Sequence, residues 1–299
     1  MFFVVNQKAG RGAGARAFAQ VRPLLSADEA FAFTTCVGDG ERIAAEAAAA
    51  GHSIVVAVGG DGTINEVVNG LASAKFQPVL GILPAGGAND LAHSLGLPER
   101  PQEALALLRR KHTRRIDLGL VDFAGDRRRY YVNMLGMAVS GRIAAMTRDH
   151  KRGGSLTYLL PFLRLMFGAQ PLRFQVSMGD RVLVASATIA HLANGRREGR
   201  FFPIAPHARL DDGLLELLAV GDVPHLQRPL YAIRGLLGRV HPNRYVTRES
   251  VAYVTVRALD PLPCHMDGEP FALAPEESMD VRSDPQRLTV IAPPPTSGR

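Results

Sequence analysis

The residues best suited to chemistry follow a run of β-branched side chains in the first third of the chain. The segment Gly59-Gly60-Asp61-Gly62-Thr63 lies between the apolar run Ile54–Val58 and apolar residues that recur with a helical period. Consecutive glycines let a backbone approach an anion closely, and N–H groups at a helix start point toward it. A plain Asp-Gly turn is the alternative, but a hairpin would need a strand next and a helix follows instead. The segment therefore predicts an anion-binding loop that carries one carboxylate.

A second glycine-rich segment, Pro84-Ala85-Gly86-Gly87-Ala88-Asn89-Asp90, follows the apolar run Val79–Leu83. In an open α/β sheet, ligands bind at the carboxyl ends of the strands. Two glycine-rich strand ends are therefore expected to face one crevice. Asn89 could alternatively be an ordinary N-cap of the helix that follows.

The first turn of the chain, Asn6 to Ala15, is ambiguous. Gly10, Gly12 and Ala15 fit the pattern GxGxxG/A of dinucleotide-binding proteins. A dehydrogenase, however, would carry an acidic residue at the end of the second strand, where Thr34-Thr35-Cys36 stands. The P-loop pattern GxxxxGK[ST] is absent from the sequence, which excludes a P-loop NTPase.

Two acidic segments occur far downstream. Asp267-Gly268-Glu269 could act in catalysis, although Asp-Gly between two strands is also typical of a hairpin turn. Asp211-Asp212-Gly213 could hold a hard divalent cation through oxygen ligands, and a solvated turn is the competing interpretation.

Two kinds of pattern predict the elements that position these residues. Through about residue 120, buried-strand runs alternate with helical periods, which favours a doubly wound, parallel α/β domain. Its first helix is predicted over Ala13–Leu25. From 121 to 284 short strands dominate, among them Leu183–His191 and Val251–Val256, with helical insertions at Leu156–Phe167 and His225–Leu237. This part is predicted to be a mainly antiparallel second domain.

The composition sets limits on partners and location. The 299 residues carry a formal charge of +7, which suits anionic partners, although the predominance of Arg over Lys can also reflect genome composition. Two widely separated cysteines form neither a zinc motif nor a disulfide framework. No apolar run reaches the roughly 18 residues of a membrane span. We expect a cytoplasmic protein that meets membranes only peripherally.

Taken in order, these segments resemble the catalytic-domain superfamily of diacylglycerol kinases, which includes YegS-type lipid kinases and sphingosine and ceramide kinases. The resemblance runs from Phe3 to about Glu269. It is carried by six segments: Gly59–Gly70 with GGDGT at its start, Pro84–Ala92, Ile116–Gly119 (IDLG), Ala193–Gly195, Asp212–Glu216 and Asp267–Glu269. Two positions depart from the family pattern: Gln7 replaces a proline, and Gly87 replaces a threonine that stands near the phosphates.

The resemblance implies an ATP site in a cleft between an α/β domain and a β-sandwich domain. About residues 285–299 are expected to return to the α/β domain. It also implies Mg²⁺ and a lipid substrate. The implied nucleotide contacts are Asn6, Gly59, Gly60, Asp61, Gly62, Thr63, Glu66, Gly86, Gly87 and Asn89. The implied catalytic carboxylates are Asp61, Asp117 and Glu269. The implied magnesium loop consists of Asp211, Asp212 and the Leu214 carbonyl.

The sequence leaves several alternatives open. An NAD kinase shares the GGDGT element, and a catalytically silent nucleotide- or lipid-binding regulator would tolerate Gly87. Glu269, Asp117 or Asp61 could be the general base. Diacylglycerol is the expected acceptor, and ceramide or a sphingoid base is possible.

The predicted partner is a lipid substrate at an anionic membrane surface. Basic residues at Arg142, Arg148, Lys151 and Arg152 precede the apolar segment Leu156–Phe167, a combination that suits docking on anionic bilayers. A buried helix beside a solvated basic loop explains the pattern equally well. No nucleic-acid partner is expected, and a homodimer is possible.

Overall fold

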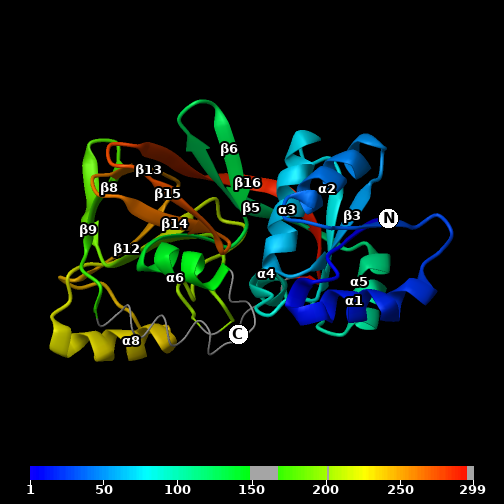
Figure 1. Cartoon of the computed structure of the whole chain (residues 1–299), viewed down its shortest axis with the longest axis horizontal. Helices are drawn as coiled ribbons and strands as arrows, with labels where there is room; N and C mark the ends of the chain where they lie inside the picture. The colour runs from blue at the N-terminus through cyan, green and yellow to red at the C-terminus, as the bar shows by residue number, and fades with distance from the viewer. Residues whose placement is uncertain (149–167, 201, 295–299) are drawn as a thin grey trace. The chain divides into compact units, whose positions relative to one another are not determined.

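The computed structural model describes residues 1–148, 168–200 and 202–294, and the chain divides into two compact units (Figure 1). The first unit comprises Met1–Ile116 and Gln286–Arg299, and the second comprises Asp117–Pro285. The chain passes between the units inside two strands, β5 (Thr113–Phe123) and β16 (Ser278–Ile291). The predicted mixed α/β architecture with an antiparallel second part is confirmed.

The first unit is built on a parallel sheet. Its strands are β1 (Phe2–Val5), β2 (Ala30–Phe33), β3 (Ile54–Gly59) and β4 (Val79–Pro84), in the order β2-β1-β3-β4, and β4 is followed by β16. The register aligns Val5 with Val58, and Gly59 with Pro84. Because the strands are parallel and in step, the turns that follow β1, β3 and β4 leave from the same edge of the sheet.

Helices cover both faces of this sheet. They are α1 (Ala9–Val21), α2 (Asp39–Ala49), α3 (Asp61–Ser73), α4 (Asp90–Ser94) and α5 (Pro101–Arg110). Val56 and Val58 lie in a core cluster with residues of α1 and α5, while Val55 and Ala57 alternate to the other face and are also fully buried. Burial on both faces explains the unbroken β-branched run of β3.

The start of α1 contains a left-handed turn. Gly10, Arg11 and Gly12 have φ values of 52°, 57° and 83°, so the continuous right-handed helix begins at Ala13, as predicted. It ends at Val21, earlier than the predicted Leu25, because Pro23 lies in a separate 3₁₀ turn, η1 (Arg22–Leu24).

The second unit is a β-sandwich. One antiparallel sheet has the order β12-β11-β10-β7-β14-β15, and β13, β8, β9 and the first half of β16 belong to the other, as do the paired strands β5 and β6. The remaining bounds are β6 (Arg127–Tyr131), β7 (Met134–Ala138), β8 (Leu172–Met178), β9 (Arg181–Ala187), β10 (Ile189–Ala193), β11 (Leu215–Val220), β12 (Val246–Val251), β13 (Tyr253–Ala258), β14 (Leu262–Met266) and β15 (Glu269–Leu273). Buried residues of both sheets form one core cluster, as in sandwich packing.

Two predicted strands of this unit are wrong in the same way. The predicted strand Leu183–His191 is broken at Thr188, and the predicted strand Val251–Val256 is broken at Ala252. At each break the chain leaves one sheet and enters the other. Because a single residue between two strands makes each crossing, the sequence shows no turn signal there.

The helices of the second unit are α6 (Val139–Arg148), the 3₁₀ turn η2 (His225–Gln227) and α8 (Arg228–Leu236). The last two confirm the predicted helical insertion at His225–Leu237. The other predicted insertion, Leu156–Phe167, lies outside the described residues. Across the described ranges, no helix has the length and apolar character needed to cross a bilayer.

Two helical glycines give a matched test of the packing. A Cβ on Gly70 in α3 would lie 2.3 Å from the Glu41 carbonyl oxygen of α2, whereas a Cβ on Gly235 in α8 would meet no atom within 4 Å. Gly70→Ala is expected to lower the unfolding free energy by about 1–3 kcal/mol through overpacking. Gly235→Ala should raise it by up to about 1 kcal/mol, because alanine favours a helix. Urea denaturation measures both, and equal effects of the two substitutions would contradict the close contact of α2 with α3.

Candidate functional site

The two predicted glycine-rich strand ends lie together in the first unit. A Cβ on Gly86 would lie 2.4 Å from the Gly60 Cα, and a Cβ on Gly60 would lie 2.8 Å from the Gly86 Cα. The Ala85 N–H donates to the Gly59 carbonyl at 2.8 Å. Only glycine fits at positions 60 and 86, and the two loops therefore present main chain without side chains between them.

Asn6, which follows β1, contacts the segment that follows β3. Its Nδ2 donates to Thr63 Oγ1 at 3.0 Å, and its Oδ1 accepts the Lys8 N–H at 3.1 Å. Its own backbone N–H donates to the Val58 carbonyl at 3.0 Å. Thr63 is buried, and its side chain occupies the space that a Cβ on Gly59 would need. The structure thus brings the predicted residues of three strand ends together.

The Asp61 carboxylate links the two loops. Its Oδ1 accepts the Leu91 N–H at 3.2 Å, at the start of α4. Burial raises the pKa of Asp61, and hydrogen bonds from backbone N–H groups, including that of Leu91, act in the opposite direction. Asp61 therefore satisfies the helix end across the loops, an interaction that the sequence does not reveal.

Asn89 has a different role from the N-cap alternative. It stands at the N-cap position of α4 with a left-handed φ of 54°, but its side chain makes no capping bond. Instead its Oδ1 accepts the Gly86 N–H at 2.8 Å, which fixes the glycine loop.

Gly87 is the exception among the loop glycines. A Cβ there would meet no atom within 4 Å. Position 87 therefore has room for a side chain, unlike positions 60 and 86.

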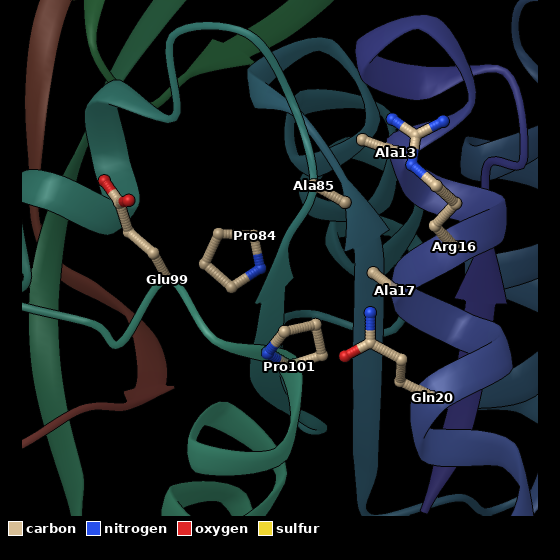
Figure 2. A pocket seen from close by; sticks show the side chains of 8 residues that line it. All are labelled: Ala13, Arg16, Ala17, Gln20, Pro84, Ala85, Glu99 and Pro101. Carbon is tan, nitrogen blue, oxygen red and sulfur yellow. The ribbon is translucent and has the colours of Figure 1, made fainter.

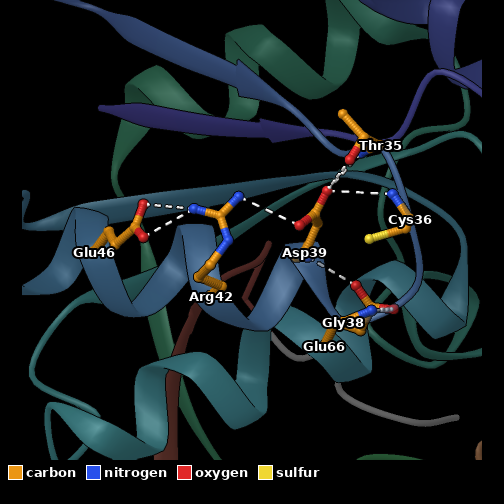
Figure 3. A network of polar contacts seen from close by, with 8 residues as sticks. Thr35, Cys36, Gly38, Asp39, Arg42, Glu46 and Glu66 are labelled. Atoms are coloured by element: carbon orange, nitrogen blue, oxygen red, sulfur yellow. Dashed lines mark hydrogen bonds and ion pairs between the residues drawn. The ribbon is translucent and has the colours of Figure 1, made fainter.

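The Glu66 carboxylate holds the start of α2 (Figure 3). It accepts the N–H groups of Gly38 and Gly40, each at 2.9 Å. In the same network, Asp39 accepts the Thr35 hydroxyl and backbone N–H, and the Thr35 hydroxyl bond is the largest cause of an Asp39 pKa well below its usual range. Glu66 thus stabilises the start of α2, and its contact with a nucleotide stays a prediction.

A pocket of about 200 Å³ lies beside the second glycine loop. Figure 2 shows Arg16 and Gln20 of α1 on one side of it and Glu99 on the other, with Pro84 and Ala85 between them. Small-molecule sites usually measure about 300–1,000 Å³. None of the predicted nucleotide contacts lines this pocket, so it is not the predicted nucleotide site.

Asp117 lies in the second unit and is fully buried. Its Oδ2 accepts the Gly213 N–H at 2.7 Å, and its backbone N–H donates to the Leu210 carbonyl at 2.6 Å. The Asn194 side chain donates to the Asp117 carbonyl at 3.0 Å. The structure therefore brings three of the family segments together, those that contain Asp117, Asn194 and Gly213.

The predicted magnesium loop, Asp211–Leu214, contains this Gly213. Asp211 pairs with Arg209 at 3.1 Å, and Asp212 Oδ1 accepts the Leu214 N–H at 3.1 Å in an Asx turn. Among the described residues, no group of three or more His, Cys, Asp or Glu side chains is arranged to hold a metal. Two exposed carboxylates and a nearby carbonyl nevertheless match the oxygen ligands of a largely hydrated Mg²⁺.

The turn before Glu269 is a two-residue hairpin, as the alternative interpretation held. Met266 pairs with Glu269, and both turn residues have positive φ, 49° at Asp267 and 86° at Gly268. These values are typical of the type I′ turn. The Asp267 carboxylate accepts three backbone N–H groups, those of Val132, Asn133 and Met134, at 2.7–2.9 Å. Asp267 therefore anchors the turn.

Glu269 is the next residue and is partly buried. Across the part of the chain that the structure describes, no side chain or N–H group pairs with its carboxylate. Asp61 belongs to the first unit, whereas Asp117 and Glu269 belong to the second.

A polar cluster around two buried histidines, which the sequence analysis missed, lies beside this turn. Glu198 contacts His265 Nε2 at 2.8 Å and His191 Nε2 at 3.0 Å, and Ser140 Oγ lies 2.7 Å from His265 Nε2. Both histidines are 1% exposed. The four residues come from separate elements, so neither motif nor spacing could have predicted the cluster.

The cluster reaches the turn through one hydrogen bond. The Gly268 N–H donates to His265 Nδ1 at 3.1 Å. His265 thus connects Glu198 to the residue directly before Glu269.

Comparison with known proteins gives consistent matches. Residues 1–121 match the diacylglycerol kinase catalytic domain, and residues 134–292 match the YegS C-terminal NAD kinase beta sandwich-like domain. A probable YegS-like lipid kinase of Chromohalobacter salexigens is 37% identical over 78% of this chain and 75% of that protein. A diacylglycerol kinase of Bacillus subtilis is 28% identical over 83% of this chain and 81% of that protein.

The fold has close counterparts among solved structures. A crystal structure of a diacylglycerol kinase from Bacillus anthracis aligns with a TM-score of 0.74 over 98% of this chain and 96% of that one, at 21% identity. This likeness supports the fold.

The Glu198 cluster predicts a pH-dependent contribution to stability. Burial raises the pKa of Glu198, but the flanking histidines outweigh it and hold the pKa well below 4.5. A lowered carboxyl pKa stabilises the fold above the unfolded value, and this stabilisation is lost as the pH falls through the folded value. Glu198→Gln should therefore cost about 3 kcal/mol near neutral pH, and less as the pH drops below about 4.5.

Urea unfolding across that pH range measures this difference. Glu249→Gln, which removes one partner of a surface pair with Arg181, is the control and should cost less than about 1 kcal/mol. A cost for Glu198→Gln that stayed constant down to acidic pH would refute the charge argument.

Proposed function

The chain belongs to the diacylglycerol kinase family of YegS-like lipid kinases, and we propose that it transfers the γ-phosphoryl group of ATP to a hydroxyl of a membrane lipid. The observation that carries this proposal is the close main-chain approach of Gly60 and Gly86 at the aligned ends of β3 and β4. Such loops bind phosphates through N–H groups, as helix starts at strand ends commonly do.

The loop residues have different roles in binding the nucleotide. The backbone N–H groups of Gly59–Gly62 and Gly87 are the proposed donors to the phosphates. Asn6 and Thr63 are already hydrogen-bonded to each other, so their orientation is set before the nucleotide arrives. Asn89 holds the Gly86 loop through its side chain. Preorganised donors of this kind cost no rearrangement during the reaction.

Asp61 is the acidic residue of this loop. Mg²⁺ bound to ATP would neutralise charge on the phosphates during transfer. Asp61 Oδ1 is held by the Leu91 N–H, which keeps the carboxylate fixed at the loop. The Asp211–Leu214 loop is the proposed structural magnesium site, where the ion would fix the turn whose Gly213 N–H meets Asp117.

Glu269 is the better candidate for the general base. Asp117 is fully buried and uses Oδ2 to hold Gly213, so its carboxylate is committed to the loop. The Glu269 carboxylate is partly exposed and unpaired among the described residues, and its turn is anchored on both sides by Asp267 and His265. A fixed carboxylate with available oxygens can orient a lipid hydroxyl and accept its proton.

The proposed acceptor is diacylglycerol or a similar lipid, presented at an anionic membrane surface. The curated relatives named as lipid and diacylglycerol kinases support this class. The +7 formal charge also suits an anionic surface.

A phosphorylation screen tests the proposal. The protein is incubated with radiolabelled ATP, Mg²⁺ and a total lipid extract, and labelled products are identified by mass spectrometry. We expect a labelled phospholipid with one added phosphate. Label in NAD and none in lipid would refute the assignment.

Two isosteric variants test the carboxylates in the same assay. Asp61→Asn keeps an oxygen that can accept the Leu91 N–H, and Glu269→Gln leaves the hairpin pairing unchanged, so both should fold normally. Each is expected to lower turnover by at least about 100-fold. The control Asp126→Asn changes an exposed loop residue whose left-handed φ of 58° suits asparagine, and it should stay active. Substantial activity of Asp61→Asn would discard its role.

Position 87 allows a reverse test. Because the space around Gly87 is open, Gly87→Thr should fold without loss of stability and return a hydroxyl beside the phosphate-binding amides. We expect the KM for ATP to fall, by up to about tenfold for one added hydrogen bond. The control Gly86→Thr should destabilise the protein, because the Gly60 backbone blocks a Cβ there. Thermal unfolding and steady-state kinetics measure both variants, and a raised KM in Gly87→Thr would contradict the expectation.

A further inference from the structure

An apolar stripe lies on the outside of α8. Eleven large hydrophobic residues are exposed in the described part of the chain, and four of them fall between residues 226 and 237, in η2, in α8 and at the end of α8. They are Leu226, Leu230, Ile233 and Leu237, with exposed fractions of 97%, 46%, 54% and 58%. Their spacing of four, three and four residues places them on one face of a helix.

The opposite face of α8 packs against the rest of the second unit. Tyr231 belongs to a core cluster with residues of β11 and β12, and its hydroxyl donates to Asn243 Oδ1 at 3.2 Å. Arg228 is 2% exposed and donates to the carbonyls of Val223 and Ala169, each at 2.9 Å. The helix is therefore held to the second unit by its inner face, and the four apolar side chains of the stripe are exposed.

The charged side chains within the segment that carries the stripe have one sign. The segment from 223 to 244 contains four arginines and no acidic residue. Arg234, Arg239 and Arg244 are exposed, and the fourth, Arg228, is the buried anchor. The neighbouring acid, Asp222, lies 3.5 Å from Arg228. An exposed apolar stripe beside unopposed arginines is typical of helices that lie in the surface of anionic membranes.

We propose that the α8 stripe is the surface through which the protein docks on an anionic bilayer. The four apolar side chains would enter the boundary between headgroups and acyl chains, while Arg234, Arg239 and Arg244 meet lipid phosphates. A second copy of the chain fits less well, because two copies joined at this face would bring like charges together. The inference rests on the proposed lipid kinase function, and it assigns docking to a surface other than the predicted one around Leu156–Phe167.

Vesicle sedimentation tests the docking surface directly. The full chain is mixed with vesicles of phosphatidylcholine containing phosphatidylglycerol, and with vesicles of phosphatidylcholine alone. Leu230→Gln with Ile233→Gln should lower partitioning onto the anionic vesicles by about tenfold. Arg234→Gln with Arg239→Gln should lower it by about fivefold for each arginine, and added salt should remove this part.

A matched control separates the stripe from exposed apolar residues in general. Leu24→Gln with Val182→Gln replaces residues of similar exposure, 48% and 50%, outside the stripe and should bind vesicles like the wild type. The stripe variants should keep the wild-type melting temperature, because their side chains point away from the core. A large fall in melting temperature would show that the face packs inside the fold and would overturn the proposal.

Activity and size measurements complete the test. The stripe variants should lose phosphorylation of diacylglycerol in anionic vesicles and keep phosphorylation of detergent-dispersed diacylglycerol. Absence of phosphorylation in both formats by the wild type would refute diacylglycerol as the acceptor, while unchanged vesicle binding by the variants would refute the docking surface alone. A wild-type dimer that the stripe variants convert to monomers, without a change in vesicle binding, would assign the stripe to self-association.

Discussion

The close approach of Gly60 to Gly86 is the constraint on which the rest of the first unit depends. It requires the ends of β3 and β4 to be level, and the register that pairs Gly59 with Pro84 provides this. With no side chain between the loops, the Asp61 carboxylate can reach the start of α4 and accept the Leu91 N–H. One backbone contact thus sets the spacing of the loops, the position of the acid and the start of a helix.

Much of this site could be predicted because strand ends in a parallel sheet share an edge. Glycine-rich turns after β3 and β4 were enough to place Gly60, Asp61 and Gly86 together. The partners of each side chain could not be predicted, since they depend on loop conformation. Asn89 has a left-handed φ and bonds to Gly86, so the capping position alone gave no guide to its role.

The second unit was harder to predict because its contacts join distant parts of the chain. The boundaries at Thr188 and Ala252 were missed since a strand can change sheets across one residue without glycine or proline. The Glu198 cluster was missed for a related reason. His191 and His265 are neighbours only because β10 and β14 both pair with β7. Single histidines in apolar strands carry no signal of such a pairing.

The carboxylates of the family segments differ in what holds them. Asp61, Asp117 and Asp267 each accept one or more backbone N–H groups, and through these bonds they fix a helix start, a loop and a hairpin turn. The oxygens of such a carboxylate are occupied by N–H groups, so fewer of them are available to a substrate. Among the described residues, no backbone N–H group donates to the Glu269 carboxylate. Its turn is nevertheless fixed by Asp267 on one side and by His265 on the other. The same sequence motif therefore contains Asp267, which anchors the turn, and Glu269, whose carboxylate stays available for the contact with substrate that we propose.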